Sequence, residues 1–326
     1  MDGLQDVAKN LVAKGKGILA ADEKLSSIEK RFSALGIPST HESRRAYREM
    51  LFTTPGIEQY ISGIIQFDET LRDQILKNPN VISGIKVDEG IEDSVGTEGE
   101  KITKGIEGLA NRLKEYKSLG AKFTKWRAVF SISATTPSLE CIEKNADLLS
   151  EFAFISQSEG FVPIVEPEVL MDGDHSIDKC YETTRAILKI VFEKLKQKNV
   201  DFTSMLLKPN MILPGKEREE KVTSVEVAQK TMEVLKQVVP SGVPGVVFLS
   251  GGQTEDQATE NLREMNKLKS SSPDGAGVDF ELSFSYGRAL QNSALKAWAG
   301  KQENVKIAQD AFLKRAKMNS EARYGK

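Results

Sequence analysis

The chain has 326 residues, of which 39% are hydrophobic and 28% are charged, and its formal net charge at pH 7 is −2. This composition is ordinary for a globular protein that is long enough to bury a large core. It excludes the strongly basic field that favours nucleic acid, and no apolar run reaches the roughly 18 residues of a membrane span, so we expect neither nucleic acid nor membrane as a partner.

In chain order, short apolar runs alternate with longer stretches of helical period. An amphipathic N-terminal helix is predicted at about 2–14. Eight apolar runs with the character of strands follow, at 17–23, 60–67, 81–88, 123–131, 161–170, 204–213, 243–252 and 280–288. Helical patterns lie between them, at 26–36, 176–199, 223–239 and 254–269, and the chain ends in a short helical tail. The first of these patterns has the capping-box spacing from Ser26 to Glu29 and closes at Gly36.

Alternation of strands and helices predicts a parallel sheet. Eight such units in about 300 residues match a closed (β/α)₈ TIM barrel of the α/β class. An open, doubly wound sheet is the alternative, but the G-x-G-x-x-G turn that usually follows its first strand is missing here. We see no linker, so residues 1–326 are expected to form a single barrel domain.

Charged residues lie inside five of the predicted strands, toward their C-terminal halves. They are Asp22, Lys86, Lys125 with Arg127, Glu166 with Glu168, and Lys208, which shares a strand face with Asn210. In a barrel these strand ends form the active-site face. Burial of one unpaired charge costs several kcal/mol, so these acids and bases are expected to meet around the barrel axis. An internal ion-pair network without function is the alternative, but five strands with charges at one end favour a functional site.

Such a site suits an amine that attacks a carbonyl group to form a Schiff base. The unperturbed pKa of a lysine side chain is about 10.4, and burial or a nearby cation lowers it. Lys208 has the apolar flanks, Lys125 and Lys86 could supply the positive charge, and Glu166 could move the protons. These rules do not choose between Lys208 and Lys125 as the nucleophile.

Two glycine-containing turns predict a phosphate site. Ser250, Gly251 and Gly252 end the seventh predicted strand, before a helix, and Ser285, Gly287 and Arg288 end the eighth. Exposed backbone N–H groups at a helix N-terminus bind anions, and TIM barrels commonly hold phosphate in these two loops. The expected substrates are therefore phosphorylated carbonyl compounds.

Histidine and cysteine are scarce. The two histidines are His41, at an expected helix start, and His175, in a polar loop, and surface or capping roles are expected for both. Cys141 and Cys180 are far apart in sequence and lack CxxC spacing, which fits buried thiols in a reducing cytosol. Because transition-metal sites usually use several such ligands, we expect no metal, and we expect no other cofactor. The cysteine usage predicts a cytoplasmic location.

With these residues in view, the chain closely resembles class I fructose-bisphosphate aldolase. The likeness runs through "GKGILAADE", "KWR", "VPIVEPE", "LLKPN", "FLSGGQ" and "SYGRALQNSALKAW" to about residue 320. The resemblance implies a (β/α)₈ barrel that cleaves fructose 1,6-bisphosphate reversibly into dihydroxyacetone phosphate and glyceraldehyde 3-phosphate. It also implies a homotetramer.

The resemblance assigns roles to matching positions. It makes Lys208 the Schiff-base lysine, Glu166 the proton-transfer carboxylate with Glu168 beside it, and Asp22 the acid at the cleaved bond. Lys125 and Arg127 would assist Schiff-base formation and position the substrate, and Lys86 would contact the sugar. Phosphate would bind at Ser27, Arg31, Ser250, Gly251, Gly252, Ser285, Gly287 and Arg288. Where many members have a Ser-Thr-Gly run, this chain has Lys24, Leu25 and Ser26, which either strengthens a phosphate contact or only replaces a neutral residue.

Two further hypotheses remain open. One is a related lysine barrel, such as a transaldolase or another sugar-phosphate lyase. The other is a scaffold that binds partners through surface charge, for example at the basic end 314–326, although this segment reads more simply as a solvated helix end. A cytoskeletal partner could bind an active enzyme as well, but nothing in the sequence supports such a partner.

Overall fold

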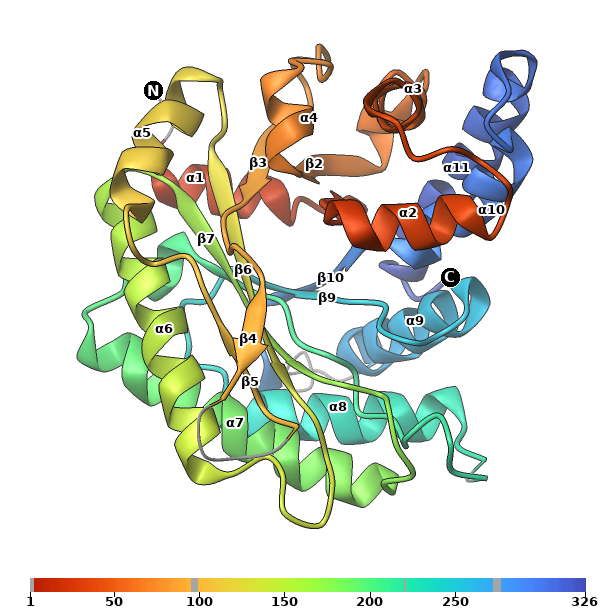
Figure 1. Ribbon diagram of the computed structural model, residues 1–326. Helices are drawn as coiled ribbons and strands as arrows, with labels where there is room; N and C mark the ends of the chain where they lie inside the picture. The colour runs from red at the N-terminus through yellow and green to blue at the C-terminus, as the bar shows by residue number, and fades with distance from the viewer. Residues whose placement is uncertain (1–2, 95–98, 220, 272–276) are drawn as a thin grey trace.

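Eight parallel strands close into a barrel in the computed structural model, which describes residues 3–94, 99–219, 221–271 and 277–326 (Figure 1). Around the barrel the order is β1-β10-β9-β8-β7-β6-β3-β2. The strands are β1 (Gly17–Ala21), β2 (Ile61–Gln66), β3 (Ile82–Lys86), β6 (Phe123–Phe130), β7 (Val162–Val169), β8 (Leu206–Leu207), β9 (Gly245–Phe248) and β10 (Glu281–Tyr286). The predicted TIM barrel is confirmed, and the closed order excludes the open sheet.

Helices form the outer layer. They are α1 (Leu4–Leu11), α2 (Leu25–Ser33), α3 (His41–Phe52), α4 (Asp68–Arg72), α5 (Leu109–Ser118), α6 (Leu139–Ser158), α7 (Ile177–Gln197), α8 (Ser224–Val238), α9 (Glu255–Ser271), α10 (Arg288–Trp298) and α11 (Val305–Ala322). Short 3₁₀ turns occupy Ile57–Gln59, Phe202–Ser204 and Gln302–Asn304. The apolar stripes seen in the sequence face the strands and bury one large core.

Three elements differ from the sequence prediction. Helix α2 begins at Leu25 with Lys24 as its N-cap, so the Ser26–Glu29 capping box does not form. The sixth predicted strand forms regular β-sheet pairing only at Leu206 and Leu207, because Pro209 has no N–H group to continue the pairing. An antiparallel hairpin of β4 (Ile91–Asp93) and β5 (Lys101–Thr103) follows β3 and was not predicted.

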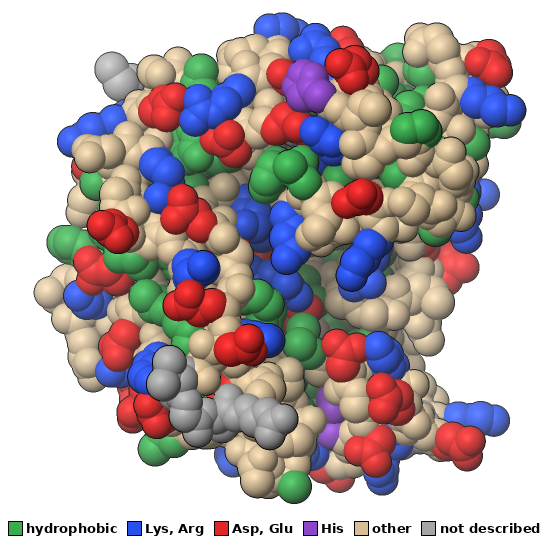
Figure 2. Space-filling model, in the orientation of Figure 1, with side chains coloured by type: hydrophobic (Ala, Val, Ile, Leu, Met, Phe, Trp, Pro, Cys, Tyr) green, Lys and Arg blue, Asp and Glu red, His purple; other side chains and the backbone are tan. Residues whose placement is uncertain are grey.

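The N-terminal end of the barrel is closed and the C-terminal end is open. Ala8, Leu11 and Val12 of the α1 region pack against barrel-interior residues such as Phe123. At the other end, where the loops after the strands meet, Lys and Arg side chains gather around a hollow (Figure 2). The charged hollow therefore opens at the C-terminal end of the barrel.

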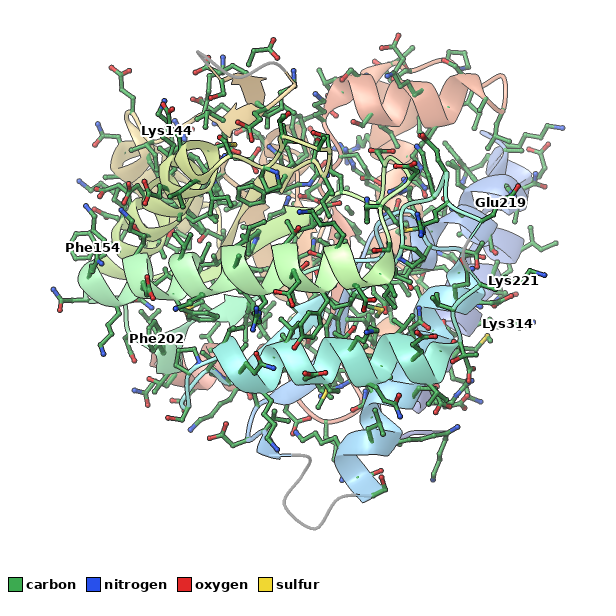
Figure 3. The ribbon with its side chains drawn as sticks, turned by 90° about the horizontal axis from the view of Figure 1, so that it is seen from below. Lys144, Phe154, Phe202, Glu219, Lys221 and Lys314 are labelled. Atoms are coloured by element: carbon green, nitrogen blue, oxygen red, sulfur yellow. The ribbon has the colours of Figure 1, made fainter. Side chains whose placement is uncertain are left out.

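The end of the chain, after the last helix, contacts the N-terminal region. Arg315 and Arg323 are buried, and Arg323 donates hydrogen bonds to the carbonyl groups of Leu282 and Val12 at 3.0 and 3.2 Å. The basic end therefore packs against the barrel and is not simply a solvated helix end. In the outer layer, α7 and α8 run side by side (Figure 3).

Candidate active site

The charged residues predicted inside the strands meet in one cavity of about 440 Å³ at the C-terminal end of the barrel. The predicted residues that line it are Asp22, Ser27, Arg31, Lys86, Lys125, Arg127, Glu166, Glu168, Lys208, Ser250, Gly251, Ser285, Gly287 and Arg288. They come from the ends of β1, β3, β6, β7, β8, β9 and β10 and from α2 and α10. Since parallel strands end at the same edge of a barrel, residues far apart in sequence converge here.

A chain of four buried charges crosses the floor of the cavity. The Nζ atom of Lys125 lies 2.5 Å from Oδ2 of Asp22 and 3.2 Å from Oε2 of Glu166. The Nζ atom of Lys208 lies 3.2 Å from Oε1 of Glu166. Glu166 therefore stands between the two amines and presents one oxygen to each.

The neighbouring charges shift the pKa values in this chain. Burial alone would raise the pKa of Asp22, but attraction to Lys125, Lys208 and Lys86 lowers it to about 2. Burial likewise opposes ionisation of Glu166, yet Lys125, Lys208 and Arg127 hold its pKa below the usual value. Burial would lower the pKa of Lys125, but Asp22, Glu166 and Asp88 together raise it. At neutral pH both carboxylates are ionised and Lys125 is a cation.

This arrangement separates the two candidate nucleophiles. Among the described residues, Lys125 is held by two carboxylates, whereas Lys208 has one ion-pair partner, Glu166, which it shares with Lys125. The sequence suggested Lys125 as a positive charge near Lys208. That charge is largely neutralised by the two carboxylates that Lys125 contacts. Lys86 is compensated in the same way by an ion pair with Asp88.

Two further ion pairs lie above this floor. Arg127 Nε is 2.5 Å from Oε2 of Glu168, two residues along β7 from Glu166. Lys86 pairs with Asp88, and burial lowers the pKa of Lys86 despite this partner. Glu168 therefore orients Arg127, and Asp88 orients Lys86.

One side of the cavity is built to receive an anion. Helix α10 begins at Arg288, directly after Gly287, and its N-terminus faces the cavity. Arg288 also donates a hydrogen bond to the carbonyl group of Gly251. The hydroxyl of Ser285 is buried and has no hydrogen-bond partner within the described residues, so it is available to a ligand.

A second set of anion-binding groups comes from α2. Arg31 pairs with Glu23 and donates to Oε1 of Gln291 at 2.9 Å, which fixes the guanidinium at the cavity wall. Ser27 lies one turn before it on the same helix face. The cavity thus has two sets of polar anion-binding groups, one at the start of α10 and one on α2.

Gly252 is the exception among the predicted residues, because it does not line the cavity. The backbone turns at Gly251, whose φ is 54°, and a Cβ atom on Gly252 would lie 3.3 Å from the sulfur of Met171. The residue after the turn therefore points away from the substrate space.

Several lining residues were not proposed as site residues from the sequence; they are Glu23, Lys24, Lys30, Asp88, Gly90, Ile91, Leu249 and Ala20. Spacing gave a signal for three of them. Lys30 lies three residues after Ser27 on one helix, Asp88 lies two residues after Lys86, and Ala20 lies two residues before Asp22. Lys24 had a signal as well, because it stands where many members of the family have a neutral residue. The others depend on loop paths that no spacing rule predicts.

The histidines lie outside the cavity. His41 is exposed at the start of α3, with Nε2 3.2 Å from Oδ1 of Asp73, as expected for a surface role. His175 differs from expectation, because its loop is packed and the side chain is buried, which lowers its pKa. Across the described ranges, no three His, Cys, Asp or Glu side chains are grouped to hold a metal ion.

Comparisons with known proteins agree with this geometry. The family model described as fructose-bisphosphate aldolase class-I matches residues 3–326. A probable class 1 fructose-bisphosphate aldolase of Xanthomonas campestris is 47% identical, over all of this chain and 98% of that protein. The cytosolic fructose-bisphosphate aldolase 4 of Arabidopsis thaliana is 49% identical, over 95% of this chain and 80% of that protein.

Among solved structures, the chain is similar to the fructose-bisphosphate aldolase of Plasmodium falciparum, crystallised with TRAP and a small-molecule inhibitor. The TM-score is 0.95 at 45% identity, and the match covers 99% of this chain and 94% of that one. A fructose-bisphosphate aldolase of Spinacia oleracea that is 48% identical is named as the cytoplasmic isozyme, and the Arabidopsis protein is named as cytosolic. These names confirm the expected location. No helix in the described part of the chain is long and apolar enough to cross a bilayer.

Proposed function

Because the chain belongs to the class I fructose-bisphosphate aldolase family, we propose that Lys208 is the amine that forms the Schiff base of the reaction. The activity is reversible aldol cleavage of fructose 1,6-bisphosphate to dihydroxyacetone phosphate and glyceraldehyde 3-phosphate, in glycolysis and gluconeogenesis. The observation that supports the residue assignment best is the position of Glu166, 3.2 Å from the amines of both Lys208 and Lys125.

Attack on the substrate ketone requires an amine that can give up a proton. Lys125 is a poor candidate, since Asp22 and Glu166 both stabilise its charged form. Lys208 can pass a proton to Glu166, its one ion-pair partner, and then attack the ketone carbon. Lys125 remains a cation that stabilises the developing negative charge on the substrate oxygen.

Glu166 then returns the proton it received. The carbinolamine formed by Lys208 must lose its hydroxyl as water, and the protonated Glu166 supplies the proton for that departure. The product is an iminium ion on Lys208, so the positive charge facing Glu166 is restored. The two steps therefore balance in protons and leave the charges of the site unchanged.

Carbon–carbon cleavage follows from the iminium ion, which accepts the electron pair of the breaking bond. The base that removes the proton from the hydroxyl next to that bond is Asp22, which lies across the cavity floor and is ionised at neutral pH. The aldehyde product leaves first, and protonation and hydrolysis of the remaining enamine release the ketone product. No step requires a metal or an organic cofactor.

The two phosphates of the substrate would be held by the two sets of anion-binding groups in this cavity. Ser250, Gly251, Ser285 and Arg288 surround the α10 N-terminus and suit one phosphate, while Ser27 and Arg31 suit the other. Lys86 and Arg127, each fixed by a carboxylate, would contact the sugar between them. Because the cavity has two sets of anion-binding groups, a bisphosphate should bind better than a monophosphate.

We further propose that the 326 residues form one domain and that the chain assembles as a homotetramer, as the family resemblance implies. A coupled assay tests the activity with purified protein. Fructose 1,6-bisphosphate should give both triose phosphates in equal amounts. Fructose 6-phosphate with an aldose-phosphate acceptor should give little product, whereas faster turnover of that pair would indicate a transaldolase.

A further inference from the structure

The outer wall of the barrel is thinnest over β2 and β3. The crossover helix between them, α4, has five residues, whereas α6 and α7 have 20 and 21. Parallel strands in a barrel are normally apolar on the face that the helices cover. Here the outward side chains include Ser62, Gln66 and Ser83, which are polar.

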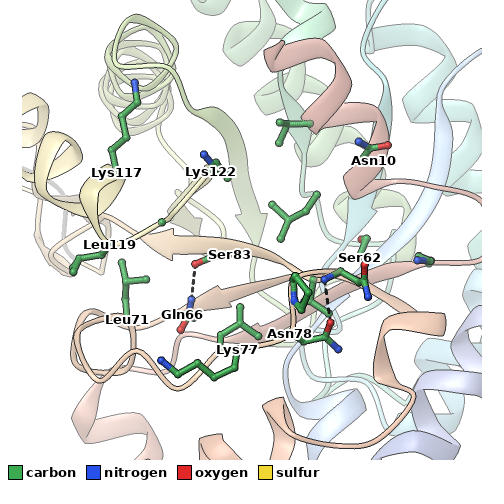
Figure 4. A pocket seen from close by; sticks show the side chains of 18 of the residues that line it. Asn10, Ser62, Gln66, Leu71, Lys77, Asn78, Ser83, Lys117, Leu119 and Lys122 are labelled. Atoms are coloured by element: carbon green, nitrogen blue, oxygen red, sulfur yellow. Dashed lines mark hydrogen bonds between the residues drawn. The ribbon is translucent and has the colours of Figure 1, made fainter. Parts of the chain in front are cut away.

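A cavity of about 1100 Å³ occupies this place, between α1, the segment 74–83 and the turn before β6 (Figure 4). It is separate from the active site. It opens near residues that precede strands, such as Lys16 before β1 and Lys122 before β6, whereas the catalytic groups lie at the C-terminal strand ends. No residue lines both cavities.

The charge of this cavity is one-sided. Lys16, Lys77, Lys117 and Lys122 line it, and no Asp, Glu or Arg does so within the described residues. Lys117 donates to the carbonyl group of Glu159 at 2.8 Å, which leaves its charge unneutralised. The chain as a whole has a net charge of −2, so four lysines without a carboxylate among them form a local exception.

The lysines are also free to bind. The side chains of Lys16, Lys77 and Lys122 make no hydrogen bond or ion pair with any described residue, and Lys77 and Lys122 are exposed. Ser83 accepts a hydrogen bond from Gln66 at 2.8 Å, which leaves its own hydroxyl hydrogen for a ligand.

From these observations we propose that the cavity binds a small organic polyphosphate. The lysines come from three separate segments, so only a ligand with more than one anionic group can engage several of them. Lysine ammonium groups bind phosphate as point charges, without the fixed fork geometry of a guanidinium group. The volume admits a nucleotide-sized molecule, whose apolar part would lie against Leu4, Val7 and Leu119.

Calorimetric titration of the full-length protein tests the proposal. The probes are sodium tripolyphosphate, ATP without metal, adenosine, and a tetraglutamate peptide. The double variant Lys77→Glu/Lys122→Glu reverses two exposed charges of the cavity. The matched control Lys114→Glu/Lys301→Glu reverses two exposed lysines outside it. Circular dichroism and aldolase activity should be unchanged in both variants.

Tripolyphosphate and ATP should each bind the wild type and the control variant with the same affinity. Each should bind the cavity variant at least tenfold more weakly. Binding of ATP alone would support the site and show that the nucleoside contributes. Equal binding to both variants, or binding of neither phosphate probe to the wild type, would overturn the proposal, as would tetraglutamate binding as tight as that of tripolyphosphate. Adenosine binding as strong as that of ATP would also overturn it. The result does not depend on Lys208, so the proposed catalytic roles can fail independently.

Discussion

At the scale of single residues, the site depends on how one carboxylate is shared. Glu166 faces Lys125 with one oxygen and Lys208 with the other, and both amines hold its pKa low. We propose that Glu166 takes the proton of the Lys208 amine, which lies 3.2 Å from it, while Lys125, paired with two acids, stays charged. The division of labour between the two lysines therefore follows from the number of acids that each one contacts.

Replacement of Glu166 by Gln preserves the shape of the side chain and removes its ability to carry a proton. Because proton transfer by a positioned group typically contributes about 10²- to 10⁴-fold, kcat for fructose 1,6-bisphosphate cleavage should fall by that factor, with a smaller change in KM. Steady-state kinetics would show this. Glu140→Gln, on the exposed face of α6, is the control and should keep wild-type rates. A Glu166→Gln enzyme within threefold of the wild type would rule out the shuttle.

Asp22 gives a prediction for stability against pH. Its pKa is about 2 in the folded protein, below the ordinary value of 3.8, so the unfolded chain binds a proton more readily. The stabilisation is therefore fully present above about pH 4 and is lost as the pH falls toward about 2. It amounts to about 2 kcal/mol.

Urea unfolding at about pH 5 and about pH 3 measures this for the wild type and for Asp22→Asn. The gap in unfolding free energy between the two proteins should narrow at the lower pH. A gap that stays constant would mean that Asp22 titrates alike in the folded and unfolded chains.

At the scale of elements, close packing inside the barrel sets where the strands can carry side chains. A Cβ atom on Gly84 of β3 would overlap the ring of Phe123 at the start of β6, and one on Gly17 would overlap Phe284. Gly84 lets the ring of Phe123 fill the barrel below the charged layer, whereas Gly17 makes room for Phe284 in the outer core between the strands and the helices. The catalytic layer thus rests on a packed apolar floor.

The substitution Gly84→Ala should therefore destabilise the fold by about 1–3 kcal/mol through overpacking. Urea or thermal unfolding measures the change, and Gly3→Ala, whose Cβ would have only an ordinary contact, is the control. Adding Phe123→Leu should recover part of the loss. Equal stability of Gly84→Ala and wild type would show that β3 and β6 are not in tight contact.

The sequence predicted the strands well, because apolar runs and the alternation of side chains are local signals. It also placed the charges at one end, since parallel strands end together. It did not predict which acid meets which base, because pairing depends on positions around the closed barrel. The β4–β5 hairpin escaped notice because its short strands, Ile91–Asp93 and Lys101–Thr103, have little apolar alternation, and the burial of His175 follows from a loop path.

At the scale of the whole molecule, the barrel keeps its two ends distinct. Reaction chemistry occupies the open C-terminal end, the α1 region closes the N-terminal end, and the basic cavity lies outside β2 and β3. A ligand in that cavity would lie against the same strands that carry Lys86. Binding there can be measured without disturbing the active site.

The homotetramer proposed from the family resemblance is a property of this scale. Sedimentation equilibrium of the purified protein should give a mass four times that of the 36.0 kDa chain. The value should not change on dilution through the micromolar range if the assembly is stable. A mass equal to one chain would contradict the proposed assembly and leave the catalytic assignment intact.

The account as a whole rests on which amine condenses with the ketone, and trapping with borohydride measures that directly. Protein mixed with dihydroxyacetone phosphate and reduced with sodium borohydride should carry one added triose phosphate per chain, which peptide mass spectrometry should locate on Lys208. A Lys208→Met variant should fold but trap nothing. An adduct on Lys125, or wild-type protein that acquires none, would contradict the mechanism.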